Sequence, residues 1–314
     1  MRSTRRDFLK ASSLVGIGAT VPTFLARTAR AAPQAGAPGA KDTILVVVEL
    51  TGGNDGLNTV IPYADPEYAK LRPTLKIPAD RVLKVNDSLG LHPSMSGLSG
   101  LLEDGALSVV QGVGYPNPSQ SHFRSMDIWQ AASTDEDLTE GWVGKALKKL
   151  NAPTFHIAAG NESAPLALEG APARVPSITS LEDFQLKTAA ASRADKQNQQ
   201  EVIQEAARAG AAKPGLLDFV RRTALNTYSS SQKLQEIGRN YQPKVPYPTT
   251  GLANRLKLAA QLIDAGLGAR IFYVSIGNFD THANQLNAHA QLLSELSGAI
   301  TAFYKDLAER GHKD

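Results

Sequence analysis

The sequence predicts an α/β fold in which a mostly parallel central sheet carries helices on both faces. Two observations support this prediction. Apolar, β-branched runs at 43–50 and 270–276 lack polar alternation, which is typical of strands buried on both faces of a parallel sheet. Segments with helical periodicity lie between the predicted strands, and strands that alternate with helices favour a parallel sheet.

The predicted elements follow one another in a regular order. The first strand, Thr43–Leu50, ends in the glycine-rich loop 51–56, where glycines let the backbone approach a ligand closely. The later predicted elements are a helix over 94–103, strands over 107–113, 155–159, 166–168 and 175–178, and helices from about 120, over 251–266 and over 287–309. The last helix ends before Gly311, a residue suited to a left-handed helix end.

A stretch from about 183 to 247 differs in composition from the rest of the predicted domain, which covers 42–314. Its segments 197–211 and 216–239 are polar and have helical periodicity with few bulky apolar residues. This pattern fits an inserted helical layer on the outside of the sheet. It also fits a solvated linker of fraying helices.

The first 31 residues have the layout of a removable bacterial export signal. Residues 4–10 read Thr-Arg-Arg-Asp-Phe-Leu-Lys, an apolar stretch covers 14–25, and Ala29-Arg30-Ala31 provides a cleavage site. Residues 32–41 form a linker rich in Ala, Pro and Gly. We therefore expect the twin-arginine translocation machinery as a partner, a periplasmic or secreted location, and no permanent membrane span, because the apolar stretch is too short.

Charge and cysteine content exclude several classes of function. Residues 1–31 hold six of the 33 Lys and Arg and one of the 30 Asp and Glu, so the mature chain has a net charge of −2 with neutral His. Without a basic excess, nucleic-acid binding is not expected. The chain has no cysteine, so any metal is held by Asp, Glu, His, Asn or hydroxyl oxygen.

Three polar clusters follow predicted strands or begin a helix at one edge of the sheet, where ligands bind in open α/β folds. They are Asn54 with Asp55, the segment 119–125 with Ser121 and His122, and Asp280 with His282. A carboxylate and an imidazole suit zinc or manganese, whereas Asp55 with Asn54 and hydroxyls suits a harder ion such as calcium or magnesium. Ser121 at a helix N-terminus lies where anions are favoured, so metal and hydroxyl together predict phosphate or sulfate ester chemistry.

Each of these residues also has a structural interpretation. Asp55 fits a turn or helix cap, Ser121 fits an N-cap, and Asp280 with His282 fits a surface pair that shares an ion only in an irregular loop. The other histidines are interpreted as structural or solvated. His92 and His156 are expected to be structural, and His289 and His312 to be solvated.

Three segments, 49–59, 121–129 and 278–282, resemble the hallmark segments of an exported bacterial family filed as domain of unknown function 1501 and grouped with alkaline phosphatases and sulfatases. The resemblance implies an alkaline phosphatase-like α/β/α sandwich and descent from a one-metal or two-metal hydrolase. It implies that Asp55 is a bridging metal ligand, that a hydroxyl near Ser121 is the nucleophile, and that Asp280 and His282 bind a second ion.

The chain also departs from that family's pattern. The spacing of Asp280 and His282 is narrower than usual in the superfamily, and the family's closing motifs do not occur before Asp314. We therefore expect the natural protein to continue beyond Asp314, with a fold that is incomplete at this C-terminus. The cysteine that sulfatases convert to formylglycine is absent, which disfavours that branch.

The leading functional hypothesis is an exported metal-dependent hydrolase of the alkaline phosphatase type. Its expected substrate is a small or glycan-attached phosphate or sulfate ester, and its expected cofactor is zinc, manganese, calcium or magnesium. The expected metal ligands are Asp55, Asp280 and His282, and the expected catalytic residues are Ser121 and His122. The alternative is a non-catalytic exported protein that keeps the hydrolase scaffold for binding.

Overall fold

A computed structural model describes residues 43–150, 152–181, 238, 240–266 and 268–312. The chain divides into two compact units. The larger comprises Ile44–Thr179, Gln242–Ala260 and Ile271–Asp314, and the smaller includes Gln261–Arg270. The predicted signal (1–31), linker (32–41) and most of the predicted helical insert lie outside the described residues.

The larger unit contains a four-stranded parallel sheet. Its strands, in spatial order, are β1 (Leu45–Leu50), β7 (Ile271–Ile276), β5 (Thr154–Ile157) and β6 (Ser177–Ile178). All neighbouring strands are parallel. All six β7 residues are buried, which explains why this strand lacks polar alternation in the sequence.

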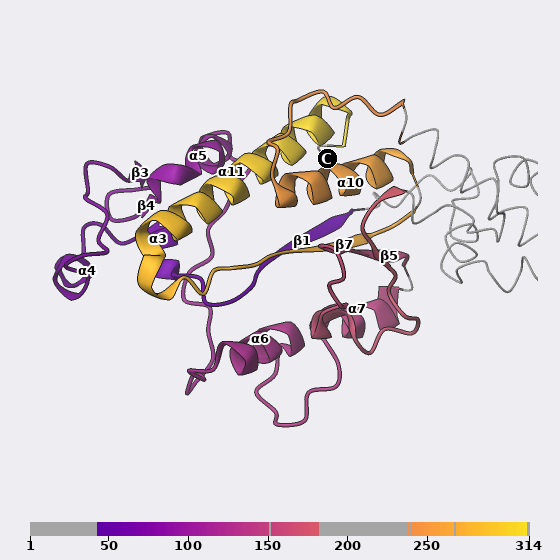
Figure 1. The fold of residues 1–314 in the computed structure, drawn as a ribbon, viewed down its shortest axis with the longest axis horizontal. Helices are drawn as coiled ribbons and strands as arrows, with labels where there is room; N and C mark the ends of the chain where they lie inside the picture. Colours follow the sequence, from indigo (N-terminus) through magenta and orange to yellow (C-terminus); the bar gives the residue numbers. More distant parts are fainter. Residues whose placement is uncertain (1–42, 151, 182–237, 239, 267, 313–314) are drawn as a thin grey trace, which may run out of the picture. The chain divides into compact units, whose positions relative to one another are not determined.

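Helices flank this sheet within the larger unit (Figure 1). One face carries α11 (Gln285–Glu309) and the first turns of α10 (Gly251–Asp264). The other carries α6 (His122–Ala131) and α7 (Trp142–Leu150). The predicted α/β class, with a parallel sheet between helices, is therefore confirmed.

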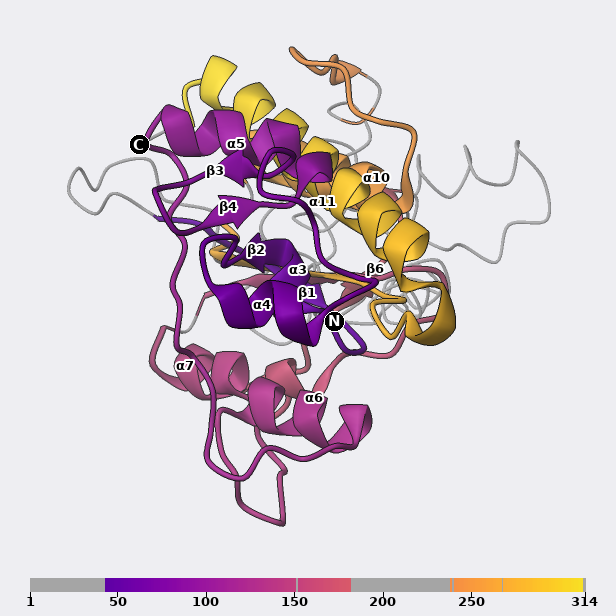
Figure 2. The same ribbon diagram turned by 90° about the vertical axis from the view of Figure 1, so that its left-hand side faces the viewer.

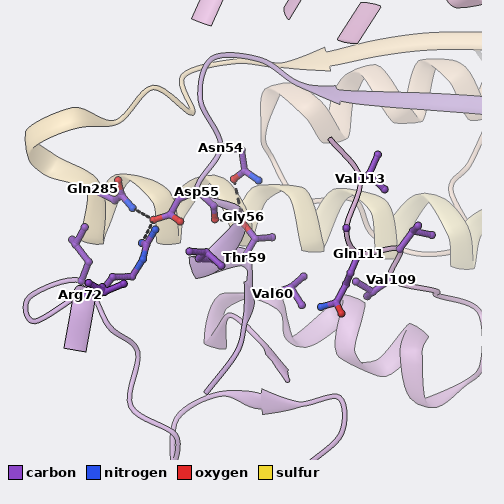
Figure 3. Close-up of a pocket in the computed structure, with 15 residues that line it drawn as sticks. Asn54, Asp55, Gly56, Thr59, Val60, Arg72, Val109, Gln111, Val113 and Gln285 are labelled. Carbon is purple, nitrogen blue, oxygen red and sulfur yellow. Dashed lines mark hydrogen bonds and ion pairs between the residues drawn. The ribbon is translucent and has the colours of Figure 1, made fainter. Parts of the chain in front are cut away.

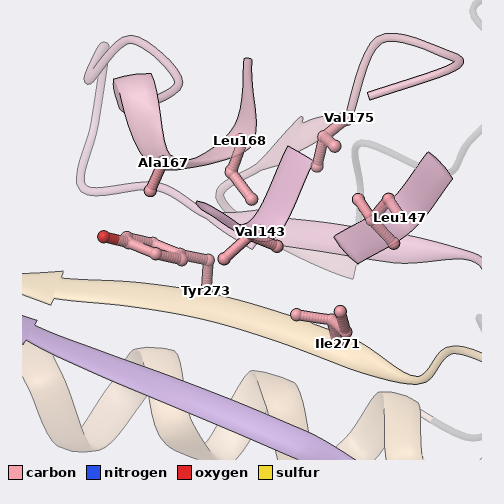
Figure 4. Packing of buried hydrophobic residues seen from close by; sticks show 7 residues of the cluster. All are labelled: Val143, Leu147, Ala167, Leu168, Val175, Ile271 and Tyr273. Carbon is pink, nitrogen blue, oxygen red and sulfur yellow. The ribbon is translucent and has the colours of Figure 1, made fainter. Parts of the chain in front are cut away.

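Part of the core lies between the sheet and α7. Figure 4 shows Ile271 and Tyr273 of β7 pointing toward Val143 and Leu147 of α7. Ala167, Leu168 and Val175 complete this cluster. On the other face of the sheet, the rings of Phe155 and Phe272 stack at 5.9 Å. Burial of such side chains contributes about 1.5–3 kcal/mol each, so the sheet is a rigid base for the loops at its edge.

A small antiparallel sheet lies beside the first loop and was not predicted from the sequence (Figure 2). It consists of β2 (Val60–Ile61), β4 (Gly90–Leu91) and β3 (Leu83–Lys84). Two short helices, α3 (Gly56–Thr59) and α4 (Pro66–Leu71), lie within the same segment. Strands of two residues carry too little periodicity to be recognised in a sequence.

Most of the longer elements agree with the sequence prediction within a few residues. A short η1 helix (Pro93–Met95) leads into α5 (Ser96–Glu103), and another 3-10 turn, η4 (His282–Asn284), leads into α11. Among the described residues, no helix combines the length and the apolar character needed to cross a membrane.

Two predicted strands are absent from the described structure. Residues 107–113 form no strand, and Val110 and Val113 are 79% and 61% exposed, since the structure pairs this segment with no neighbouring strand. A β-branched run becomes a strand only when it finds a hydrogen-bonding partner. Residues 166–168 form the 3-10 helix η2 (Leu166–Leu168) instead, directly after Pro165.

Candidate functional site

The loops that follow β1 and β7 run side by side beyond the carboxyl ends of the strands. The Thr51 amide donates to the Ile276 carbonyl oxygen at 2.9 Å, and the Phe279 amide donates to the Thr51 carbonyl oxygen at 3.2 Å. These bonds continue the contact between the two strands into their loops. They place Gly52 directly against Asp280, where an added Cβ would lie 2.7 Å from the Asp280 amide nitrogen.

Three side chains predicted from the sequence meet at this edge. The Nε2 atoms of His282 and His122 lie 2.7 Å and 3.3 Å from Asp280 Oδ1. The two imidazole rings are 6.4 Å apart and nearly perpendicular. All three side chains are exposed to solvent, at 42% for Asp280, 47% for His122 and 76% for His282.

The backbone of the loop after β7 explains how Asp280 and His282, only two residues apart, point to the same place. Asn278 and His282 have positive φ values of 72° and 40°. Such values are uncommon for residues other than glycine, cost on the order of 1 kcal/mol or more, and gather at functional sites. The irregular loop that the sequence argument required for this spacing is therefore present.

Helix α6 brings His122 to the cluster. Ser121 is its N-cap, with Oγ accepting a hydrogen bond from the Arg124 amide at 3.4 Å, and His122 is its first residue. The preceding loop is held by Tyr115, whose hydroxyl lies 2.9 Å from Ser125 Oγ. The predicted catalytic Ser121 thus has the structural role that the sequence also allowed, while its side chain remains exposed next to His122.

The far end of α6 is tied to the sheet by Glu49 of β1. Gln130 Nε2 donates to Glu49 Oε1 at 2.7 Å. Burial raises the pKa of Glu49, while hydrogen bonds from Gln130 and Tyr273 lower it and the nearby Glu162 carboxylate raises it. Because α6 is attached to β1 at this end, the position of His122 is set by the sheet.

The geometry of the three side chains fits a divalent metal ion. One ligand atom from each of His122, Asp280 and His282 lies within 4.8 Å of the others. A tetrahedral zinc ion with bonds of about 2.0–2.1 Å separates its ligand atoms by about 3.3 Å. The contact from His122 to Asp280 has this length, and the contact from His282 needs to open by about 0.6 Å.

Asp55, the other predicted metal ligand, has different partners (Figure 3). Its Oδ1 accepts from the Asn58 amide at 3.2 Å, which caps α3. Its Oδ2 contacts Arg72 Nη1 at 2.5 Å and accepts a hydrogen bond from Gln285 Nε2. The structure does not bring the Asp55 carboxylate into the cluster of His122, Asp280 and His282, hereafter the His–Asp–His cluster. A metal-bridging role for Asp55 therefore stays a prediction from the sequence.

Asp55 and Arg72 line an open pocket of about 1080 Å³. The walls of this pocket are partly apolar and include Val109 and Val113 of the unpaired segment 107–113 (Figure 3). None of the three clustered residues, His122, Asp280 and His282, lines it. The pocket and the cluster are therefore formed by different residues.

A second pair of histidines lies beneath this loop, and it corrects the expectation for His289. Only 2% of His289 is exposed, because α11 turns this residue toward Asn54, whose Oδ1 lies 3.0 Å from His289 Nε2. Its ring is 5.9 Å from that of His92. Burial, aided by His289 and Arg81, lowers the pKa of His92 to about 4.

Burial also lowers the pKa of His289, although the nearby Asp55 carboxylate raises it. The structural interpretation of His92 is supported by its Nδ1 atom, which accepts a hydrogen bond from the Ser94 amide at 3.1 Å. His156 is fully buried, with Nδ1 2.9 Å from Ser177 Oγ. His312 is exposed at the end of α11.

Several residues of the site could not be predicted from the sequence alone. Arg72 lies 17 residues from Asp55, and nothing in the local pattern marks it as the partner of that carboxylate. Gln285 and Gln130 are ordinary helix residues in the sequence, but they bind Asp55 and Glu49. The glycines 52 and 53 were expected to approach a ligand, and in the structure they lie against Asp280 and His122.

Comparison with known proteins adds one finding to this geometry. No curated protein and no solved structure matches the chain. The model of one protein family matches residues 42–314, which is most of the sequence and includes every residue of the site. The chain therefore belongs to the family described as "Protein of unknown function (DUF1501)".

Proposed function

We propose that the protein is an exported, metal-dependent hydrolase of the alkaline phosphatase type that acts on a phosphate or sulfate ester. The observation that carries the proposal is the convergence of His122, Asp280 and His282 at the carboxyl edge of β7, with their ligand atoms within 4.8 Å of one another. This is the edge at which open α/β sheets bind their ligands.

The donor set favours zinc or manganese over calcium or magnesium. Two imidazole nitrogens and one carboxylate oxygen are typical of zinc and manganese sites, whereas calcium and magnesium prefer oxygen ligands alone. Three protein ligands leave a coordination position open, and the exposure of all three side chains gives a substrate access to it. A divalent ion in this place supplies Lewis-acid polarisation of an ester oxygen.

The chain's own residues supply the rest of the proposed chemistry. His122 and His282 orient Asp280 and define the position that an ester oxygen would face. Helix α6 begins at His122, so the positive end of its dipole lies at a residue of the cluster and favours an anion nearby. Ser121 is the candidate nucleophile because its exposed hydroxyl adjoins His122, and His122 serves in this proposal as a metal ligand.

The cellular part of the proposal rests on the sequence. The twin-arginine pattern in residues 1–31 supports export of the folded chain to the periplasm or beyond through the twin-arginine translocation machinery. This route suits a protein that acquires its metal before export. A small or glycan-attached ester outside the cytoplasm is the corresponding substrate class.

The test compares the wild-type chain with Asp280→Ala and with Asp127→Ala, which removes an exposed carboxylate of α6 outside the cluster. Calorimetry measures zinc binding, and p-nitrophenyl phosphate and p-nitrophenyl sulfate measure hydrolysis. We expect about one zinc ion per wild-type chain. Loss of one of three ligands weakens binding by at least about 100-fold in Asp280→Ala, while Asp127→Ala binds as wild type.

The outcomes separate the two classes of function. Zinc binding with hydrolysis that fails in Asp280→Ala supports the hydrolase. Zinc binding without hydrolysis of either ester supports the non-catalytic binding protein that keeps the scaffold. If the wild-type chain binds no zinc or manganese at micromolar concentration, the metal centre and the function built on it are wrong.

A further inference from the structure

The ring of His122 lies directly on the backbone of Gly53. A Cβ atom added to Gly53 would lie 2.5 Å from His122 Cε1, 2.8 Å from Nδ1 and 3.1 Å from Nε2. Non-bonded atoms at the first two distances overlap strongly, because the optimal separation of two non-bonded carbon atoms is about 3.5–4.0 Å and a nitrogen atom is only slightly smaller. The imidazole therefore occupies the space that any side chain at position 53 would need.

We propose that Gly53 is a positioning residue for the metal centre, and that its missing side chain seats the His122 imidazole so that Nε2 faces Asp280. This inference rests on the proposed function. Gly53 is not among the glycines with positive φ, so its backbone conformation is open to other residues. Position 53 requires glycine because the His122 ring fills the space of a side chain, and not because of its backbone conformation.

The neighbouring Gly52 has a different role. Its φ of 105° lies in the region that favours glycine, and an added Cβ would lie 2.7 Å from the Asp280 amide nitrogen. A substitution at Gly52 would distort the loop itself. Gly53 is therefore the position at which the placement of one ligand can be changed without imposing backbone strain.

Helix α6 has little freedom to move away from a larger residue at position 53. Its last turn is held to β1 by the hydrogen bond from Gln130 to Glu49, and its first turn by the contact between Tyr115 and Ser125. The ring of His122 must then rotate away from position 53. Such a rotation takes Nε2 away from Asp280 Oδ1, which lies 3.3 Å from it in the wild-type chain.

The test is a double-mutant cycle that combines Gly53→Ala with His122→Ala, and its matched control is Gly56→Ala. An added Cβ at Gly56 would meet no atom within 4 Å. Zinc affinity is measured by calorimetry, and the midpoint of thermal unfolding is recorded for each variant. We expect Gly53→Ala to weaken zinc binding by at least about 10-fold, as loss of a ligand-orienting contact does.

The cycle shows whether Gly53 acts through His122. In the His122→Ala background, Gly53→Ala should change the zinc affinity by less than about twofold, because the ring that it displaces is gone. Gly56→Ala should bind zinc as the wild-type chain does. The proposal is wrong if Gly53→Ala binds zinc like the wild-type chain, or if it weakens binding equally with and without His122.

A crystal structure of metal-free Gly53→Ala separates this inference from the proposed function. We expect the distance from His122 Nε2 to Asp280 Oδ1 to exceed 4 Å in the variant. If that distance stays at 3.3 Å, the inference is overturned even when the wild-type chain binds zinc. If the wild-type chain binds no metal, the proposed function fails and with it the role of Gly53 in a metal centre, while a displaced ring still shows that Gly53 seats the His122 imidazole against Asp280.

Discussion

Two pairs of histidines flank the loop after β1, and their similar geometry contrasts with their chemistry. The rings of His122 and His282 are 6.4 Å apart at 78°, and those of His92 and His289 are 5.9 Å apart at 84°. The first pair is exposed and shares the carboxylate of Asp280. The second pair is buried, and its polar neighbour in the loop is the neutral amide of Asn54.

The difference teaches that the surroundings of a histidine pair decide its chemistry. A carboxylate between two exposed imidazoles, such as Asp280 in the first pair, offers the donor set of a metal site, which is the role proposed for it. Burial holds the imidazoles of His92 and His289 in their neutral form and lowers both pKa values, even though the Asp55 carboxylate acts on His289 in the opposite direction. The same contrast separates Asp280, which is exposed between imidazoles, from Asp55, which is bound by Arg72.

Among the buried residues near the loop after β1, replacement of Asp55 should cause the largest loss in the free energy of unfolding. The side chains of Asp55 and Arg72 are only 12% and 22% exposed, so Asp55→Ala leaves a largely buried guanidinium without its partner and removes the cap of α3. We expect the free energy of unfolding to fall by about 3 kcal/mol in denaturant titrations.

Zinc affinity is the second measurement on Asp55→Ala, and it sharpens the contrast with Asp280. We expect the zinc affinity of Asp55→Ala to stay within about threefold of the wild-type value, which corresponds to about 0.7 kcal/mol of binding free energy. A loss of zinc binding as large as that in Asp280→Ala would show that Asp55 is a metal ligand, as the sequence predicts, and would abolish the distinction between the two carboxylates.

Acid should destabilise the protein through the buried histidines. The pKa of His92 is about 4 in the folded chain and about 6.5 when unfolded, so its contribution is present above pH 6.5 and is lost as the pH falls toward 4. Asn keeps an N-cap at this position without a titrating ring. Between about pH 7.5 and 4.5, wild type should lose about 2 kcal/mol more unfolding free energy than His92→Asn.

Denaturant titrations at several pH values measure this difference. The groups that face His92 are His289 and Arg81, and the lowered pKa of His289 contributes to the acid sensitivity with the same sign. Some acid dependence should therefore persist in His92→Asn. Equal pH dependence in the two proteins would mean that His92 titrates normally and that the buried pair has no special environment.

Ser121 gives the smallest expected effect on stability. Ser121→Ala removes the cap of α6 and should lower the free energy of unfolding by about 1 kcal/mol. Ser121→Asp keeps a capping oxygen and removes the hydroxyl, so it should restore most of that loss. Hydrolysis separates the two roles, because a nucleophilic Ser121 predicts no turnover in Ser121→Asp despite its restored stability.

The main sheet was predictable where its strands are apolar runs without polar alternation, but the expectation of burial on both faces holds for β7 and not for β1. Among the described residues β1 lies at an edge of the sheet, with Leu45 exposed and its other five residues partly buried. The runs that became β1 and β7 carry this apolar pattern without ambiguity, and α11 carries a clear helical period. The run at 107–113 is also rich in Val, although it contains Ser, Gln and Gly, and it forms no strand. Composition cannot show whether a partner strand is available, and hydrogen bonding to a partner is what decides it.

The sequence predicted which residues form the site, but it did not predict which other side chains those residues contact. Asp280, His282 and His122 were recognised because they follow a strand or begin a helix at one edge of the sheet. The separate environment of Asp55 depends on Arg72 and Gln285, which approach from segments 17 and 230 residues away. Helical periodicity placed His289 in a helix but gave no sign that it faces the interior.

The exposure of the His–Asp–His cluster has a consequence for metal identity. The three side chains of the proposed metal site are each at least 42% exposed, so an ion bound there would be open to exchange with the surrounding medium. Affinity alone then favours copper over zinc, and zinc over manganese, in any compartment that holds all three. The metal found in a purified sample would therefore reflect the last medium that the chain met rather than the compartment in which it folded.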